Sequence, residues 1–111
     1  MLKNFRTHTL AVEFYQECKT VRLPAYAKDQ LRRAAFSVAL NLAEGAARPG
    51  LKDRVRFYSI SLASLREVQS IIQLEGLKQL EAKADHLGAC LYKLATLLCE
   101  CEGWGSMSSP P

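Results

Sequence analysis

The side chains best suited to chemistry are the histidines and cysteines, and their spacing decides what they can do. His86 and Cys90 lie one helical turn apart and offer two metal ligands, whereas a structural zinc site needs four. Cys99 and Cys101 are two residues apart, so they point to different sides of a helix. Neither His8 nor His86 has a glutamate three residues before it, as a di-metal carboxylate enzyme requires. We therefore predict no metal site and no cofactor.

The other common arrangements of catalytic residues are also missing. Gly45 and Gly50 do not reproduce the glycine-rich loop that binds phosphates in nucleotide-binding proteins. No nucleophile, base and orienting acid occur at a recognisable spacing. The sequence therefore predicts a protein that is not an enzyme, and only stoichiometric metal in the purified protein would favour a metal-dependent bundle enzyme.

One polar pair interrupts the otherwise apolar stretch FSVALNLAEGAAR. Asn41 and Glu44 lie one helical turn apart, and a buried polar group without a hydrogen-bond partner costs about 1–3 kcal/mol. We expect both side chains to bond to the backbone or to an arginine of the following helix, Arg54 or Arg56. Their expected role is structural, because a buried carboxylate held by arginine would fix the register of two helices.

Basic residues are concentrated in the first part of the chain. Residues 1–66 hold twelve Lys/Arg and five Asp/Glu, and the rest hold three and six, which gives an excess charge of +7 and then −3. The candidate nucleic-acid-binding residues lie around one turn: Arg32, Arg33, Arg48, Lys52, Arg54, Arg56 and Arg66. Such a cluster neutralises phosphates with strong salt dependence and little sequence preference. No aromatic residues are interleaved to stack bases, so we expect contacts to the nucleic-acid backbone.

The same charges fit a second interpretation. They form either a solvated face or salt bridges to the acidic last helix of the same or a neighbouring subunit. Salt-dependent RNA binding that is lost when Arg32 and Arg33 are reversed would separate the two interpretations.

Hydrophobic periodicity predicts four helices and no strand, so the expected fold class is all-α. The first helix should begin at an N-cap of Thr7 or Thr9 and end before Leu23 and Pro24. The other three should cover residues 25–47, 52–74 and 78–101. Short connections predict an antiparallel, up-and-down four-helix bundle over residues 1–103, followed by a disordered tail at 104–111.

The apolar positions indicate which side chains fill the core. On the last helix they alternate spacings of four and three from Leu80 to Leu98, as in helices packed at a shallow angle. The third helix has two apolar stripes: Val55, Tyr58, Leu62, Leu65 and Ile72 form one, and Phe57, Ile60, Ser64, Val68 and Ile71 form the other. A helix with two buried sides needs two sets of partners.

The second helix has more apolar residues than one core requires. Leu31, Ala35, Val38 and Leu42 fill the bundle, and other apolar residues remain on the outside. We therefore predict a subunit interface made of Phe36, Leu40, Ala43, Ala47, Phe57, Ile60 and Ser64.

Composition favours a single domain without a membrane span. The chain has 111 residues, of which 49% are hydrophobic. No stretch approaches the roughly 18 consecutive apolar residues that a bilayer requires. The N-terminal sequence MLKNFRTHTL lacks the apolar core of a secretory signal, so we expect a cytoplasmic protein with reduced thiols.

The run SVALNLAEGAARPGLKDRVRFYSISLASLREVQ resembles the signature of the four-helix-bundle proteins encoded in the intervening sequences of 23S rRNA genes. The matching positions are Ser37, Asn41, Ala43, Glu44, Gly45, Arg48, Phe57, Ser64, Leu65 and Glu67. Two positions depart from the family pattern, because Ala39 replaces a proline and Ala63 replaces a glycine. Asn41, Glu44 and Gly45 carry the most specific part of the resemblance.

The resemblance implies a left-handed four-helix bundle that assembles into a homopentameric ring. That family is similar to the accessory proteins of diversity-generating retroelements, which are positively charged pentamers that bind nucleic acid and a reverse transcriptase. The partners it implies are further copies of the chain, RNA or DNA, and a reverse transcriptase or another nucleic-acid-processing protein. The alternative is a structural or protein-interaction module that binds no nucleic acid.

Overall fold

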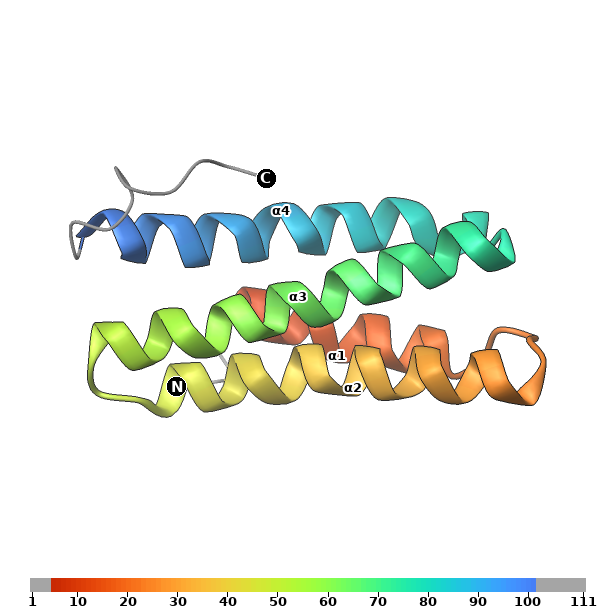
Figure 1. Cartoon of the computed structure of the whole chain (residues 1–111), viewed down its shortest axis with the longest axis horizontal. Coiled ribbons are helices and arrows are strands. Elements are labelled where there is room, and N and C mark those ends of the chain that lie inside the picture. The colour runs from red at the N-terminus through yellow and green to blue at the C-terminus, as the bar shows by residue number, and fades with distance from the viewer. Residues whose placement is uncertain (1–4, 102–111) are drawn as a thin grey trace.

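The protein is a bundle of four α-helices (Figure 1). This computed structural model describes the backbone of residues 5–101 and the side chains of residues 5–96. The helices are α1 (Arg6–Cys18), α2 (Ala25–Ala47), α3 (Leu51–Glu75) and α4 (Lys78–Cys101). The predicted all-α four-helix bundle is therefore confirmed. The predicted tail at 104–111 and the side chains of Leu98, Cys99 and Cys101 lie outside the described residues.

α3 is the helix that connects the two halves of the bundle. It begins beside α2 and crosses towards α4 along its length (Figure 1). Ser37 of α2 contacts Ser64 of α3, whereas Gly45, further along α2, approaches Phe57, nearer the start of α3. The contacts run in opposite order, so α2 and α3 are antiparallel. The left-handed sense of the bundle stays a prediction.

The core lies along the bundle axis, and leucines provide its largest fully buried side chains. The largest fully buried leucines are Leu31, Leu42, Leu65, Leu80, Leu87 and Leu91. α3 has one buried stripe, formed by Val55, Tyr58, Ser61, Leu65, Val68 and Ile72. The prediction that Val68 belongs to a second stripe is wrong, because Ser61, Leu65, Val68 and Ile72 follow one another at helical spacing on the core side.

The beginning of α1 differs from the sequence prediction. Phe5 is the N-cap residue and makes no capping side-chain bond. Thr7 lies inside the helix and is buried, and Thr9 bonds back to the carbonyl of Phe5. The N-cap prediction is therefore wrong for both threonines.

The ends of α1 and α3 depend on local hydrogen bonds. α1 ends at Cys18, earlier than expected, and the hydroxyl of Thr20 donates to the carbonyl of Glu17 over 2.8 Å. α3 ends at Glu75 and is capped by Gly76, whose φ of 67° is left-handed and favours glycine. The amide of Leu77 then donates to the carbonyl of Ile72 over 2.9 Å, as in a Schellman motif.

Candidate interface on the second and third helices

A seam of small polar side chains joins α2 to α3. The hydroxyls of Ser37 and Ser64 lie 2.8 Å apart. Ser61, fully buried, donates to the carbonyl of Val38 over 2.8 Å. The side-chain amide of Asn41 donates through Nδ2 to the carbonyl oxygen of Ser37 over 2.9 Å and to the Ser37 hydroxyl over 3.0 Å. The expected bond from Asn41 to the backbone is confirmed, and the seam satisfies polar groups where two helices meet.

Gly45 lets the two helices approach closely. A methyl group at this position would lie 2.7 Å from Cε1 of Tyr58 and 3.2 Å from Cβ of Phe57. Tyr58 is buried, and its ring packs against that of Phe5 at 6.1 Å. The glycine of the Asn41, Glu44 and Gly45 motif therefore fits a packing requirement.

Glu44 does not have the partner that the sequence suggested. Its carboxylate pairs with Arg48 over 3.0 Å, and the two side chains are about half exposed, at 49% and 42%. The expectation of a buried carboxylate held by Arg54 or Arg56 is wrong, because Glu44 lies on the outer side of α2. The spacing of four residues to Arg48 is itself a helical ion-pair signal. An exposed pair of this kind contributes about 0–1 kcal/mol.

Arg48 links this ion pair to the start of α3. Its carbonyl accepts a 2.7 Å bond from Nε of Arg54. Its guanidinium lies 4.7 Å from the ring centre of Phe57, and Arg56 lies at the same distance. Arg56 also approaches Asp53 at 3.9 Å. Arginines therefore cover Phe57, and Nε of Arg48 is buried without a hydrogen-bond partner.

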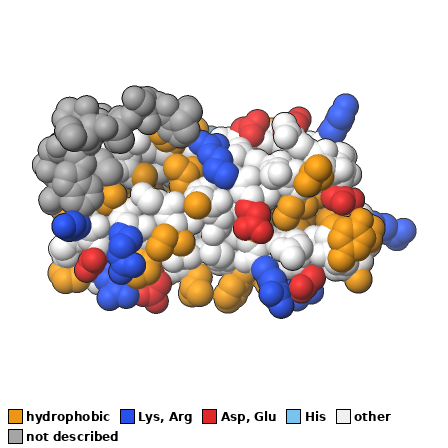
Figure 2. Space-filling view, viewed as in Figure 1, with side chains coloured by type: hydrophobic (Ala, Val, Ile, Leu, Met, Phe, Trp, Pro, Cys, Tyr) orange, Lys and Arg blue, Asp and Glu red, His pale blue; other side chains and the backbone are white. Residues whose placement is uncertain are grey.

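The seven candidate nucleic-acid-binding residues occupy three separate places. Four of them, here called the turn cluster, lie where α2 turns into α3: Arg48, Lys52, Arg54 and Arg56. Basic and acidic side chains gather at this end of the bundle (Figure 2). Arg32 and Arg33 lie on α2, both exposed, and Arg33 is fifteen residues before Arg48, or roughly 22 Å along the helix. Arg66 bonds to Gln69 over 2.9 Å and lies beside Gly88 of α4.

Acidic neighbours reduce the charge of these groups. Arg33 pairs with Asp29 over 3.2 Å, on an exposed part of α2. In the turn cluster Glu44 pairs with Arg48 at 3.0 Å and Asp53 with Arg56 at 3.9 Å, so each carboxylate lowers the positive charge around one guanidinium. The cluster remains basic, but less so than its composition suggests.

The predicted subunit interface coincides in part with an exposed apolar surface. Phe36 is 52% exposed, Leu40 is 50% exposed and Ile60 is 39% exposed. Apolar side chains follow the edge of the molecule along α2 (Figure 2). A shallow hollow of about 200 Å³ between α1 and α2 is lined by His8, Val12, Tyr15, Phe36, Ala39, Leu40 and Ala43. Ala47 is exposed, whereas Phe57 and Ser64 are half-buried by contacts within the chain.

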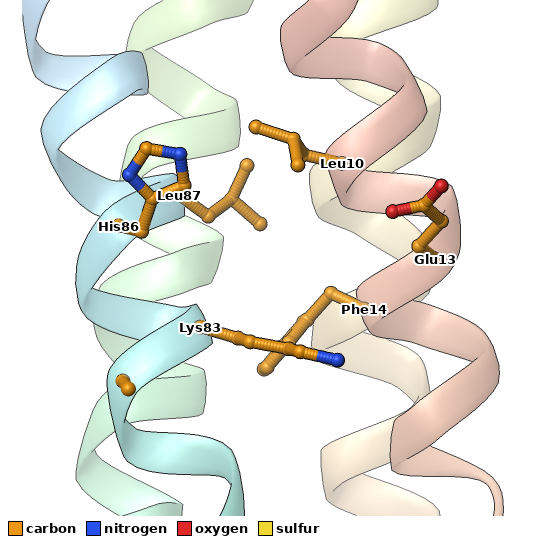
Figure 3. Close-up of a pocket in the computed structure, with 7 residues that line it drawn as sticks. Leu10, Glu13, Phe14, Lys83, His86 and Leu87 are labelled. Atoms are coloured by element: carbon orange, nitrogen blue, oxygen red, sulfur yellow. The ribbon is translucent and has the colours of Figure 1, made fainter.

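A cavity that hydrophobic periodicity does not predict lies between α1 and α4. It measures about 270 Å³ and is lined by Leu10, Glu13, Phe14, Ala82, Lys83, His86 and Leu87. Leu10 and Phe14 of α1 face α4, and the side chain of Lys83 reaches across towards α1 (Figure 3). Lys83 forms an ion pair with Glu17 at this end. The size of this cavity depends on the distance between α1 and α4, and the spacing of hydrophobic residues in the sequence does not predict that distance.

The remaining candidate ligands do not come together. Among the side chains that the structure describes, no three or more His, Cys, Asp or Glu are grouped to hold a metal ion. Burial raises the pKa of the Cys18 thiol to about 12, with a smaller contribution from the charge of Glu17. Along the described helices, none has the length and apolarity that a membrane crossing needs.

Comparison with known proteins identifies a family. Neither the curated proteins nor the solved structures include a match. The family model of the 23S rRNA-intervening sequence protein matches residues 5–98, which is nearly the whole described chain. On this match the chain belongs to the 23S rRNA-intervening sequence protein family, whose name links this small helical protein to intervening sequences of 23S rRNA.

Proposed function

We propose that the protein is a non-enzymatic, cytoplasmic homopentamer that binds the phosphate backbone of RNA or DNA. The observation that carries the proposal is the turn cluster, where Arg48, Lys52, Arg54 and Arg56 converge at the start of α3. Guanidinium and ammonium groups bind phosphate strongly. The proposal also includes a protein partner, which would be a reverse transcriptase or another nucleic-acid-processing protein.

The backbone of α3 supports phosphate binding at the same place. Gly50 is the N-cap residue and provides no side-chain cap for the first amides of the helix. The N-terminus of a helix carries partial positive charge and attracts anions. In a cyclic assembly, copies of the cluster would add their fields around one axis.

The environment of Phe57 favours backbone contacts over base stacking. Arg48 and Arg56 both lie over its ring, so the aromatic face nearest the turn cluster is already covered. Stacking of single-stranded bases needs a free aromatic face. We therefore expect little preference for sequence and similar binding to RNA and duplex DNA.

The test is binding of fluorescent RNA and duplex DNA, measured by anisotropy at increasing KCl. Affinity should fall steeply with salt, and the double variant Lys52→Gln/Arg56→Gln should reduce the slope of log K against log salt by roughly one to two. Lys93→Gln, on the exposed side of α4, is the control and should leave the slope unchanged. Absence of binding even at low salt would refute this function.

The alternative is a structural or protein-interaction module that binds no nucleic acid. Three of the arginines already have carboxylate partners in the chain, since Arg33, Arg48 and Arg56 pair with Asp29, Glu44 and Asp53. For such a module the mass of the oligomer would change with salt concentration. Adding RNA or DNA would leave that mass unchanged. Reversal of Arg32 and Arg33 would then change assembly only.

A further inference from the structure

α2 carries a regular row of residues on its outer side. The α2 row consists of Asp29, Arg33, Phe36, Leu40, Ala43 and Ala47, at alternating spacings of four and three residues. All are exposed except the half-buried Ala43. This spacing is the pattern by which one helix packs along another. Phe36 meets the ring of Tyr15 of α1 edge-on at 5.8 Å, yet both Phe36 and Leu40 remain half exposed.

α3 carries a second row with the same spacing. The α3 row consists of Ile60, Ala63, Glu67, Ser70 and Leu74, and every one of them is exposed. Leu74 is 79% exposed, the highest value among the large apolar side chains of residues 5–96. The two rows lie on different helices and are separate surfaces, because the α2 row borders the hollow between α1 and α2.

Contacts within the chain fix which residues of α2 and α3 lie at the same height along the bundle. Ser37 is level with Ser64, and Val38 is level with Ser61. Each residue forward along α2 corresponds to one residue back along α3, so the two contacts place Leu40 level with residues 59–61, centred on Ile60. By the same reasoning, residue 33 lies level with residues 66–68, centred on Glu67.

In a ring with cyclic symmetry, residues that are level within one chain are also level between neighbouring subunits. A rotation about an axis parallel to the helices moves each subunit around the ring but not along the helices. α2 of one subunit and α3 of the next would then be antiparallel, and residues of equal height within one chain would also be level between neighbours. A ring needs two different surfaces on each subunit, and the two rows provide them.

We propose that the α2 row of one subunit packs antiparallel against the α3 row of the next, with Leu40 beside Ile60 and Arg33 beside Glu67 of the partner subunit. This inference rests on the cyclic self-assembly proposed above. The occupant of the exposed face of α2 is therefore a second copy of this chain.

Charge and size complementarity support this register. Arg33 carries a positive charge and Glu67 a negative one, and both are exposed. The large side chain of Phe36 is level with the small Ala63, so a large residue faces a small one. At the far end of the bundle, Tyr26 and Leu74 are level and are 71% and 79% exposed. In this register Tyr26 of one subunit and Leu74 of the next would cover each other.

Disulfide cross-linking tests the register directly. In a background with Cys90, Cys99 and Cys101 changed to serine, Leu40→Cys and Ile60→Cys chains with different tags would be co-expressed and oxidised. The mixture should give a cross-linked heterodimer, and each variant alone should give none. A cross-link with Leu40→Cys alone would overturn the proposal, because it would mean that α2 packs against α2 of the partner.

Charge reversal gives an independent test with a rescue. Arg33→Glu and Glu67→Arg should each shift the oligomer towards monomer in mass measurements, and the two together should restore the assembly. Lys93→Glu, an equal change of charge on α4, should have no effect. Failure of the double variant to restore the mass would contradict the register.

The outcomes separate this inference from the proposed function. If the unmodified chain is monomeric by mass, the proposed homo-oligomer itself fails. If it is oligomeric but Leu40→Cys and Ile60→Cys do not cross-link, only the register fails. Nucleic-acid binding is measured in a separate experiment, and its result bears neither on the existence of the oligomer nor on the register.

Discussion

Gly45 and Gly88 are both helical glycines, but their surroundings differ. At Gly45 an added methyl group would meet ring atoms of the buried Tyr58 at 2.7 and 2.9 Å. At Gly88 it would meet only side-chain ends at longer distances, the terminal methyl of Leu65 at 3.3 Å and the amide nitrogen of Gln69 at 3.4 Å. Rigid ring atoms cannot move aside as side-chain ends can, so only Gly45 limits the distance between two helices.

We predict that Gly45→Ala lowers the free energy of unfolding by about 1–3 kcal/mol through overpacking between α2 and α3. Gly88→Ala is the matched control, because the gain in helix propensity of about 1 kcal/mol offsets mild crowding there. Urea denaturation of the two variants measures the difference. Equal stability of both variants would mean that α2 and α3 can separate at no cost.

The buried thiol of Cys18 makes stability depend on alkaline pH. Its pKa is raised from 9.0 to about 12, first by burial and then by Glu17, so the folded state keeps the proton where the unfolded state loses it. The free energy of unfolding should therefore fall as pH rises above 9. Burial also raises the pKa of Tyr58, against the opposing effect of Arg54, and acts in the same direction.

We predict that, between pH 8 and pH 10, the free energy of unfolding falls by about 1.4 kcal/mol more in the unmodified protein than in Cys18→Ala. Denaturation at the two pH values measures this difference. The comparison uses the change with pH and not the absolute stability, because loss of the thiol also alters packing. Parallel pH profiles would contradict the prediction.

At the scale of single residues, the sequence indicates a side chain's surroundings better than its partner. Asn41 bonds to the backbone, as expected. Glu44 was expected to be buried, but the hydrophobicity of its neighbours does not specify which side of α2 it occupies. Ser61 is fully buried although serine is usually exposed, because its hydroxyl bonds to the carbonyl of Val38. Such pairings depend on the distance between two helices.

At the scale of the elements, helix boundaries follow proline and glycine closely. α2 covers the predicted residues 25–47, between Pro24 and the turn that contains Pro49 and Gly50. α1 ends four residues before the expected position at Arg22, because Thr20 and the backbone of Lys19 satisfy carbonyl groups of the last turn. Proline sets only the latest point at which a helix can end.

α4 provides a paired prediction about burial. Leu91 is fully buried, whereas Leu94, an equal member of the apolar pattern, is only partly buried. Leu91→Ala should lower the free energy of unfolding by about 2–5 kcal/mol, as complete burial implies, and Leu94→Ala should cost clearly less. Thermal and urea denaturation measure both. A larger loss for Leu94→Ala would mean that a neighbouring subunit buries this residue.

At the scale of the whole molecule, periodicity predicts the bundle but not its cavities or the grouping of its charges. The basic residues near one another in sequence separate into the turn cluster, the Arg32 and Arg33 pair, and Arg66 beside α4. A helix separates residues that are fifteen positions apart by roughly 22 Å along its axis. Periodicity also does not predict how subunits are arranged, so the dimensions of the assembly must be measured to test that arrangement.

The bundle has extents of 43 × 30 × 21 Å and a radius of gyration of 14.1 Å. If the helices lie parallel to the ring axis, as the register of Leu40 with Ile60 requires, the assembly keeps one dimension near 43 Å while the other two grow. We predict a ring of that height in negative-stain images, and a Leu40→Glu variant whose scattering gives a radius of gyration near 14 Å. Leu40 is half exposed, so this variant should still fold, with unchanged helix content by circular dichroism. A ring only 20–30 Å tall would place the helices across the axis, and rotation would then no longer keep residues of equal height level.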